Sequence, residues 1–211
     1  MMASIERGSA LAGWAQAFRA ASADAADFSI REIAFATQVN LRGDGSDDAF
    51  GAATAAILGC SLPLAANTWQ KAHGTTALWL GPDEWLVVDE TQDGTALAGR
   101  LDAGLQDVHR SVVDVSAARC VIEIGGLQAR MVLAKGCSLD LHARSFRAPG
   151  CAQTLLAKAR VLIQCREASA QLRLFVASSF ADYLAQWLLD AAAECAASRD
   201  LDAGRIAARL A

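Results

Sequence analysis

Two six-residue stretches, GCSLPL at residues 59–64 and GCSLDL at residues 136–141, are identical except at one position. Each begins with a glycine that follows a run of helix-forming residues, where a glycine ends a helix at little energetic cost. Two explanations are open. The cysteines could share a metal or redox site, or the chain could contain one structural unit twice, with the two stretches at equivalent corners.

The cysteines give little support to a shared chemical site. The chain has six of them, none in a Cys-x-x-Cys motif and none near a histidine at the spacing of metal ligands. In a chain of 211 residues, a free cysteine commonly behaves as a small buried hydrophobic residue. We therefore expect six free thiols and no metal site.

The segments before the two stretches follow the same order. Before the first, VNLRG (39–43) alternates like a strand, and the next segment has one apolar helix face, formed by Phe50, Ala53, Thr54, Ile57 and Leu58. Before the second, IEIGG (122–126) is typical of a strand, and LQARMVLAK (127–135) of a short helix. The repeated order favours a duplicated unit, with the cysteines as corner residues.

The segments after the two stretches also correspond. Residues 75–90 predict two strands joined by a turn at Pro82 and Asp83, followed by a helix over residues 94–105. Residues 151–176 predict longer strands, and an amphipathic helix begins at Phe180, with Ser179 and Asp182 at the spacing of a capping box. Each half thus reads strand, helix, two strands, helix.

This order predicts an α+β fold made of two similar split β-α-β-β-α halves, each with helices on one face of an antiparallel sheet. We place an N-terminal arm or helix at residues 1–29 and the first half at residues 30–107. The second half follows at residues 108–198, and a C-terminal tail occupies residues 199–211.

Both faces of the predicted sheet in the first half are apolar. Leu78 and Leu80 share one face and Trp79 the other, and the next strand alternates in the same way, with Trp85 and Val87 opposed to Leu86 and Val88. An apolar second face must be buried against the sibling half or another chain. Trp79 and Trp85 are therefore candidate partner-interface residues, with packing in the core as the alternative.

The search for chemistry finds no catalytic, cofactor-binding or metal-ligating residues. The sequence contains no nucleophile elbow, Walker loop or dinucleotide fingerprint after a strand. The pair Gly125–Gly126 before a helix could bind an anion, but a tight turn is the simpler interpretation. Among the acidic candidates, Asp83, Glu84, Asp114 and Glu123, the residue Asp114 is the most notable; its simpler role is to accept hydrogen bonds in a turn before Ser116.

Charge and hydropathy exclude two classes of partner. Lys and Arg number 19 against 23 Asp and Glu, and no basic stripe is present, so we expect no nucleic-acid partner. The apolar segment near the start is too short to span a membrane, and we expect a soluble, cytoplasmic protein.

Several motifs together resemble the gamma subunit family of heterotetrameric sarcosine oxidase. They are QVNLRGD (38–44), LWLGPDEWLVV (78–88), VVDVS (112–116), LAKGCSLDL (133–141) and SFADYLAQWLLDAA (179–192). The resemblance extends from about Gln38 to Ala192. It implies a fold similar to the folate-binding domain of aminomethyltransferases.

The resemblance also implies a function. The complex oxidises sarcosine to glycine with hydrogen peroxide and formaldehyde, or methylenetetrahydrofolate when tetrahydrofolate is present. The alpha, beta and delta subunits would carry FAD, FMN, NAD, zinc and tetrahydrofolate, while this chain would carry no cofactor. It would be an inactive accessory subunit when isolated. The alternative is a stand-alone folate-binding protein of the aminomethyltransferase type.

Overall fold

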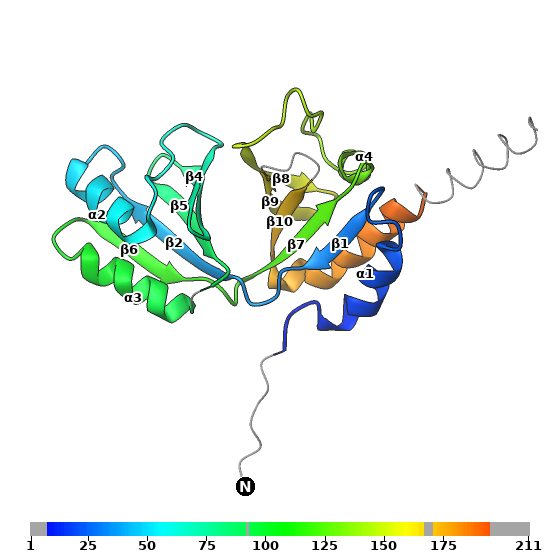
Figure 1. Cartoon of the computed structure of the whole chain (residues 1–211), viewed down its shortest axis with the longest axis horizontal. Coiled ribbons are helices and arrows are strands. Elements are labelled where there is room, and N and C mark those ends of the chain that lie inside the picture. The colour runs from blue at the N-terminus through cyan, green and yellow to red at the C-terminus, as the bar shows by residue number, and fades with distance from the viewer. Residues whose placement is uncertain (1–7, 92, 167–170, 195–211) are drawn as a thin grey trace, which may run out of the picture.

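The computed structural model describes residues 8–91, 93–166 and 171–194, and shows two five-stranded antiparallel sheets side by side (Figure 1). The sheet of the first half has the strand order β3-β4-β5-β2-β6, and that of the second half β1-β7-β10-β9-β8. The predicted α+β fold of two similar antiparallel halves is confirmed. Residues 1–7 of the predicted arm, Cys195 and the tail at 199–211 lie outside the described residues.

The elements of the first half are β2 (Thr37–Gly43), α2 (Asp48–Leu58), β3 (Trp69–Ala72), β4 (Thr75–Gly81), β5 (Glu84–Asp89), α3 (Gly94–Gly104) and β6 (Arg110–Asp114). Those of the second half are β1 (Ser29–Glu32), β7 (Arg119–Gly125), α4 (Ala129–Ala134), β8 (Cys151–Leu156), β9 (Ala159–Cys165) and β10 (Leu172–Ala177). It also contains η1 (Ala12–Trp14), α1 (Ala15–Ala21), η2 (Ser178–Phe180) and a helix over residues 181–194. The short strand β3 was missed in the sequence.

The two halves exchange their outermost strands. β1 precedes the first half in the chain but pairs with β7, and β6 follows α3 but pairs with β2. Two hydrogen bonds mark the exchange: Ile33 N donates to Val121 O at 2.9 Å, and Val115 N donates to Gln38 O at 2.8 Å. The division predicted at residues 30, 107 and 108 follows chain order, and strand pairing differs from it at these two edges.

The repeated stretches end the equivalent helices α2 and α4, but their glycines meet different needs. Gly59 adopts a left-handed conformation with φ of 77° after α2, as predicted. By contrast, α4 ends at Lys135 with helical backbone angles. A Cβ at Gly136 would lie only 2.5 Å from Cζ2 of Trp187, so this glycine is required for close approach by that ring.

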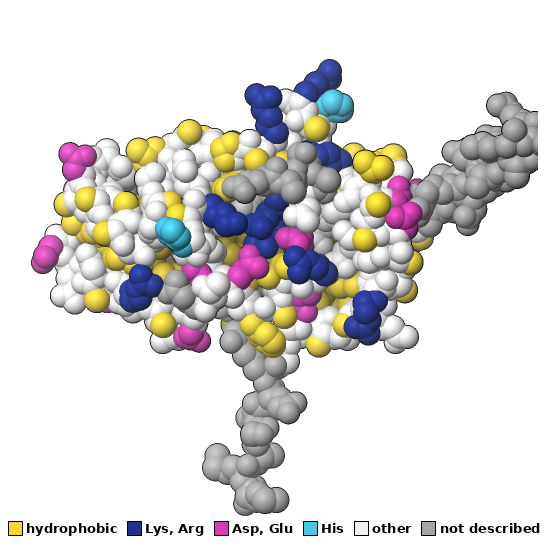
Figure 2. All heavy atoms as spheres, viewed as in Figure 1, with side chains coloured by type: hydrophobic (Ala, Val, Ile, Leu, Met, Phe, Trp, Pro, Cys, Tyr) yellow, Lys and Arg dark blue, Asp and Glu magenta, His cyan; other side chains and the backbone are white. Residues whose placement is uncertain are grey.

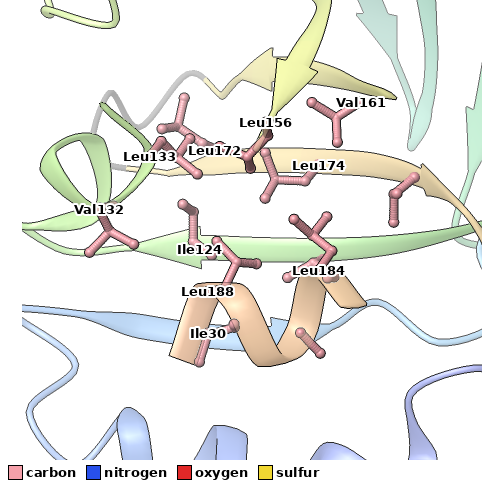
Figure 3. Close-up of a cluster of buried hydrophobic side chains, with 14 of the residues drawn as sticks. Ile30, Ile124, Val132, Leu133, Leu156, Val161, Leu172, Leu174, Leu184 and Leu188 are labelled. Atoms are coloured by element: carbon pink, nitrogen blue, oxygen red, sulfur yellow. The ribbon is translucent and has the colours of Figure 1, made fainter. Parts of the chain in front are cut away.

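Apolar side chains form three layers. The helices of each half cover the outer face of its sheet, and Figure 3 shows Leu184 and Leu188 of the last helix beside Ile124 and Leu174 of the second sheet. The third layer lies between the two sheets and includes Trp69, Leu86, Leu162 and Phe175. The apolar second face is therefore buried against the sibling half, the first of the two alternatives that the sequence left open.

Candidate functional site

The two tryptophans proposed as interface anchors occupy different environments. Trp85 is fully buried beneath α2, where its ring lies 5.9 Å from that of Phe50 and its Nε1 donates to Pro63 O at 2.8 Å. In this position the ring contributes to the core, which corrects its placement among the partner-interface residues. Trp79 pairs with Trp85 across β4 and β5 and stays half-buried.

A group of charged residues, of which Glu123 and Arg173 are buried, lies where the halves meet. Arg31, Glu123 and Arg173 stand side by side on β1, β7 and β10, and the Arg173 and Glu123 side chains are only 3% and 5% exposed. Nε of Arg173 donates to Glu123 Oε2 at 2.8 Å, while Arg31 pairs with the other carboxylate oxygen. Figure 2 shows charged side chains gathered in the middle of this face.

The network extends across both halves of the molecule. Nη1 of Arg173 lies 2.6 Å from Oε1 of Glu90, which directly follows β5 of the first half. Nε of Arg166 lies 4.0 Å from Glu123 Oε2. The guanidinium of Arg173 thus binds one carboxylate from each half, and in this way the network links the two sheets.

The electrostatics of Glu123 favour a structural role. Burial alone raises the pKa of this carboxyl, but the hydrogen bonds and charges of Arg173 and Arg31 outweigh burial and lower the pKa below its ordinary value. A carboxylate held ionised by two guanidinium groups is a poor general base, because its lone pairs are already engaged. The arrangement therefore suits cohesion rather than proton transfer.

Glu123 was among the acidic candidates found in the sequence, whereas its two arginine partners were missed. The available signal was Arg173 inside the otherwise apolar strand β10, whereas Arg31 lies in the short polar strand β1 and gave no such signal. The sequence does not show that these strands flank β7, so it could not bring the charges together.

The other candidates have local partners. Asp114 accepts from the backbone N of Ser116 at 2.9 Å and from its Oγ, as expected for a turn residue. At the glycine pair, Leu127 N and Gln128 N donate to the carbonyls of Ala26 and Asp27, so the segment is a tight strand-to-helix turn. Asp83 pairs with Arg42, and Glu84 accepts from Asn40.

Three thiols, those of Cys60, Cys120 and Cys151, are poorly suited to nucleophilic chemistry. Burial raises the pKa of Cys60, and burial together with the charge of Glu32 raises that of Cys120 to about 12. Burial likewise raises the pKa of Cys151 to about 12. A thiol with such a pKa stays protonated at neutral pH and is a weak nucleophile and metal ligand. Within the described ranges, no group of three or more His, Cys, Asp or Glu residues could hold a metal ion.

The space between the sheets opens into a pocket of 660 Å³, whose lining includes Leu80, Arg119, Arg160 and Phe175. Among the described residues, the lining of this pocket combines apolar and polar side chains with the two arginines and includes no acidic residue, histidine or cysteine. In the part of the chain that the structure describes, no helix combines the length and apolar character needed to cross a membrane.

The sequence matches the family model described as "Sarcosine oxidase, gamma subunit family" over residues 42–194. Among curated proteins, the sarcosine oxidase subunit gamma of Arthrobacter sp. is 41% identical over 169 residues, covering 79% of this chain and 81% of that protein. The subunit gamma of Corynebacterium sp. (strain P-1) is 39% identical over 168 residues, with coverage of 79% and 81%.

Solved structures show the same relationship. A chain of the heterotetrameric sarcosine oxidase from Corynebacterium sp. U-96 superposes with a TM-score of 0.81 at 36% identity, covering 89% of this chain and 95% of that one. The aminomethyltransferase T of the glycine cleavage system from Bartonella henselae gives a TM-score of 0.58 at 14% identity, covering 82% and 48%. The second likeness shows the fold alone.

Proposed function

Because the chain belongs to the sarcosine oxidase, gamma subunit family, we propose that it is the accessory subunit of a heterotetrameric, flavin-dependent sarcosine oxidase. The single observation that carries the proposal is the match to nearly the whole length of one chain of such a heterotetramer. The internal pairing of Glu123 supports a scaffold role, because the buried carboxylate is engaged by Arg31 and Arg173, and Arg173 also pairs with Glu90 of the first half.

In this role the chain supports alpha, beta and delta subunits in the cytoplasm. The complex converts sarcosine to glycine with hydrogen peroxide and either formaldehyde or methylenetetrahydrofolate. We assign FAD, FMN, NAD, zinc and tetrahydrofolate to the partner subunits.

Purification of the chain alone and together with its partners tests the proposal. We expect the isolated chain to produce no peroxide from sarcosine, and the co-expressed subunits to elute as one flavin-containing complex that includes it. Peroxide formation by the chain alone, or elution of an active complex without it, would contradict the accessory role. Calorimetry with tetrahydrofolate tests the stand-alone alternative, which requires saturable binding by the isolated chain.

Trp79 is the remaining candidate for contact with a partner. Its ring is half-buried beside the edge strand β3, so part of it is open to a neighbour. We expect Trp79→Ala to weaken assembly by about 2 kcal/mol, the usual effect of losing an aromatic interface anchor. Unchanged assembly of a folded Trp79→Ala chain would assign the ring to intramolecular packing.

A further inference from the structure

The outer surface of the second half contains a groove of 630 Å³ rich in aromatic rings. It lies between the N-terminal helical segment and the helix over residues 181–194, and its lining residues are Trp14, Tyr183, Gln186, Trp187, Leu189 and Asp190. The three rings are half-buried, so each keeps part of its surface open to solvent. Aromatic side chains in such a position are typical anchors of protein interfaces.

Each of the three rings is held by a contact of its own. Nε1 of Trp14 donates to Asp182 Oδ1 at 2.7 Å, and the hydroxyl oxygen of Tyr183 accepts from Lys158 N at 3.3 Å. Trp187 lies against Gly136, where no side chain intervenes. The rings are thus fixed before any ligand arrives, which lowers the entropy lost on binding.

The groove also carries an unneutralised negative charge. The carboxylate of Asp190 makes no ion pair or hydrogen bond within the part of the chain that the structure describes. Aromatic faces attract cations, and a carboxylate accepts hydrogen bonds from a guanidinium group in its plane. Rings and carboxylate together therefore recognise a cationic side chain, and arginine best, because its flat head can stack and pair at once.

The equivalent helix of the first half shows that the fold does not require this groove. α3 is the helix at the corresponding place after β5, and its sequence GTALAGRLDAG contains no aromatic residue. Its charged side chains are also engaged, since Arg100 donates to Ile57 O and Asp102 pairs with Arg110. Among the described residues, the aromatic groove with an unpaired carboxylate is thus found in the second half and not at α3.

We propose that this groove binds an arginine side chain of another subunit of the sarcosine oxidase complex. The proposal rests on the proposed function, because it takes its occupant from the partner subunits. The guanidinium group of that arginine stacks against the half-buried rings of Trp14 and Trp187 and pairs with the carboxylate of Asp190. Trp79 on the first half and this groove on the second are then separate points of contact.

The test compares Asp190→Asn with Asp107→Asn in complexes assembled from separately purified subunits. Both positions are exposed aspartates without a partner among the described residues, and both changes remove one charge while preserving shape. We expect Asp190→Asn to raise the Kd for the other subunits about tenfold or more, the effect of losing a charged hydrogen bond. The Asp107→Asn variant keeps the wild-type Kd. The dependence of this Kd on salt concentration becomes weaker only in the Asp190→Asn variant.

A photo-crosslinking residue placed at Gln186, an exposed residue that lines the groove, identifies the occupant. The expected product is an adduct with a partner subunit whose linked peptide contains arginine. An adduct with a second copy of this chain, with a peptide lacking arginine, or no adduct in an assembled complex would overturn the proposal. So would equal Kd values for the two variants. Failure of the wild-type chain to join the complex would instead overturn the proposed function itself.

Discussion

The same row of sheet positions carries charge in one half and apolar residues in the other. Across the second sheet the row reads Arg31, Glu123, Arg173, Gln164 and Cys151. Across the first it reads Val113, Asn40, Leu86, Leu78 and Trp69. Two equivalent backbone bonds align the rows: Ile33 N donates to Val121 O within the second sheet, and Val115 N donates to Gln38 O within the first.

The difference shows that the fold does not depend on the charges. Leu86 occupies the position of Arg173, and there it simply joins the apolar layer between the sheets. The charged row instead contacts Glu90 of the first half, so it fixes how the halves sit relative to each other. A buried ion pair is weak evidence for stability, because desolvation offsets much of its attraction, but removing one partner is costly.

The largest expected effect comes from replacing Arg173 with leucine, the residue that stands at the equivalent position of the first half as Leu86. Arg173→Leu leaves Glu123 buried with a weakened set of partners and deprives Glu90 of its guanidinium. We expect the free energy of unfolding to fall by about 3–5 kcal/mol in urea titrations. The double variant Glu123→Leu/Arg173→Leu removes both buried charges and should recover most of that loss. A double variant as unstable as Arg173→Leu would show that the pair itself stabilises the fold.

Acid unfolding sharpens the same comparison. Because the folded-state pKa of Glu123 is lowered, its contribution to stability is fully present above the unfolded pKa of about 4.3 and is lost as the pH falls through the folded value. Without Arg173 the folded pKa moves up, so unfolding should begin at a higher pH. A variant of the apolar row, Leu86→Ala, lowers stability without this change in pH dependence.

The duplication, the order of elements and the C-terminal end of α2 could be predicted from the sequence because they depend on local patterns. Periodicity identified the strands around Val39 and Ile122, and Gly59 marked a helix end. The exchange of β1 and β6 could not be predicted, because nothing local tells an edge strand which sheet to join. Of the partners of Glu123, Arg31 reaches it only through the β1–β7 pairing, and the burial of Trp85 depends on how α2 and the segment at Pro63 cover the sheet.

The two glycines that open the repeated stretches provide a second, smaller test. Gly136→Ala places a methyl group against Trp187 and near Ala157 N, and such overpacking costs about 1–3 kcal/mol. Gly59→Ala costs about 1–2 kcal/mol through its left-handed backbone. Asparagine separates the causes, because it tolerates the left-handed conformation but is larger than alanine. Asn should therefore be better tolerated than Ala at position 59 and worse at position 136. The same ranking at both sites would contradict the two explanations.

The smallest expected effect distinguishes how the two equivalent helices begin. The side chain of Asp93 caps α3, accepting from Thr95 N at 2.9 Å and from Ala96 N at 3.3 Å. No side chain caps η2, which precedes the helix over residues 181–194. Ser179 and Asp182 therefore do not form the capping box that their spacing suggested, since Asp182 accepts from Trp14 instead.

Asp93→Ala should cost about 1 kcal/mol, whereas Ser179→Ala should stay within about 0.5 kcal/mol of wild type in thermal unfolding. Equal losses for the two variants would mean that both helices depend on a side-chain cap.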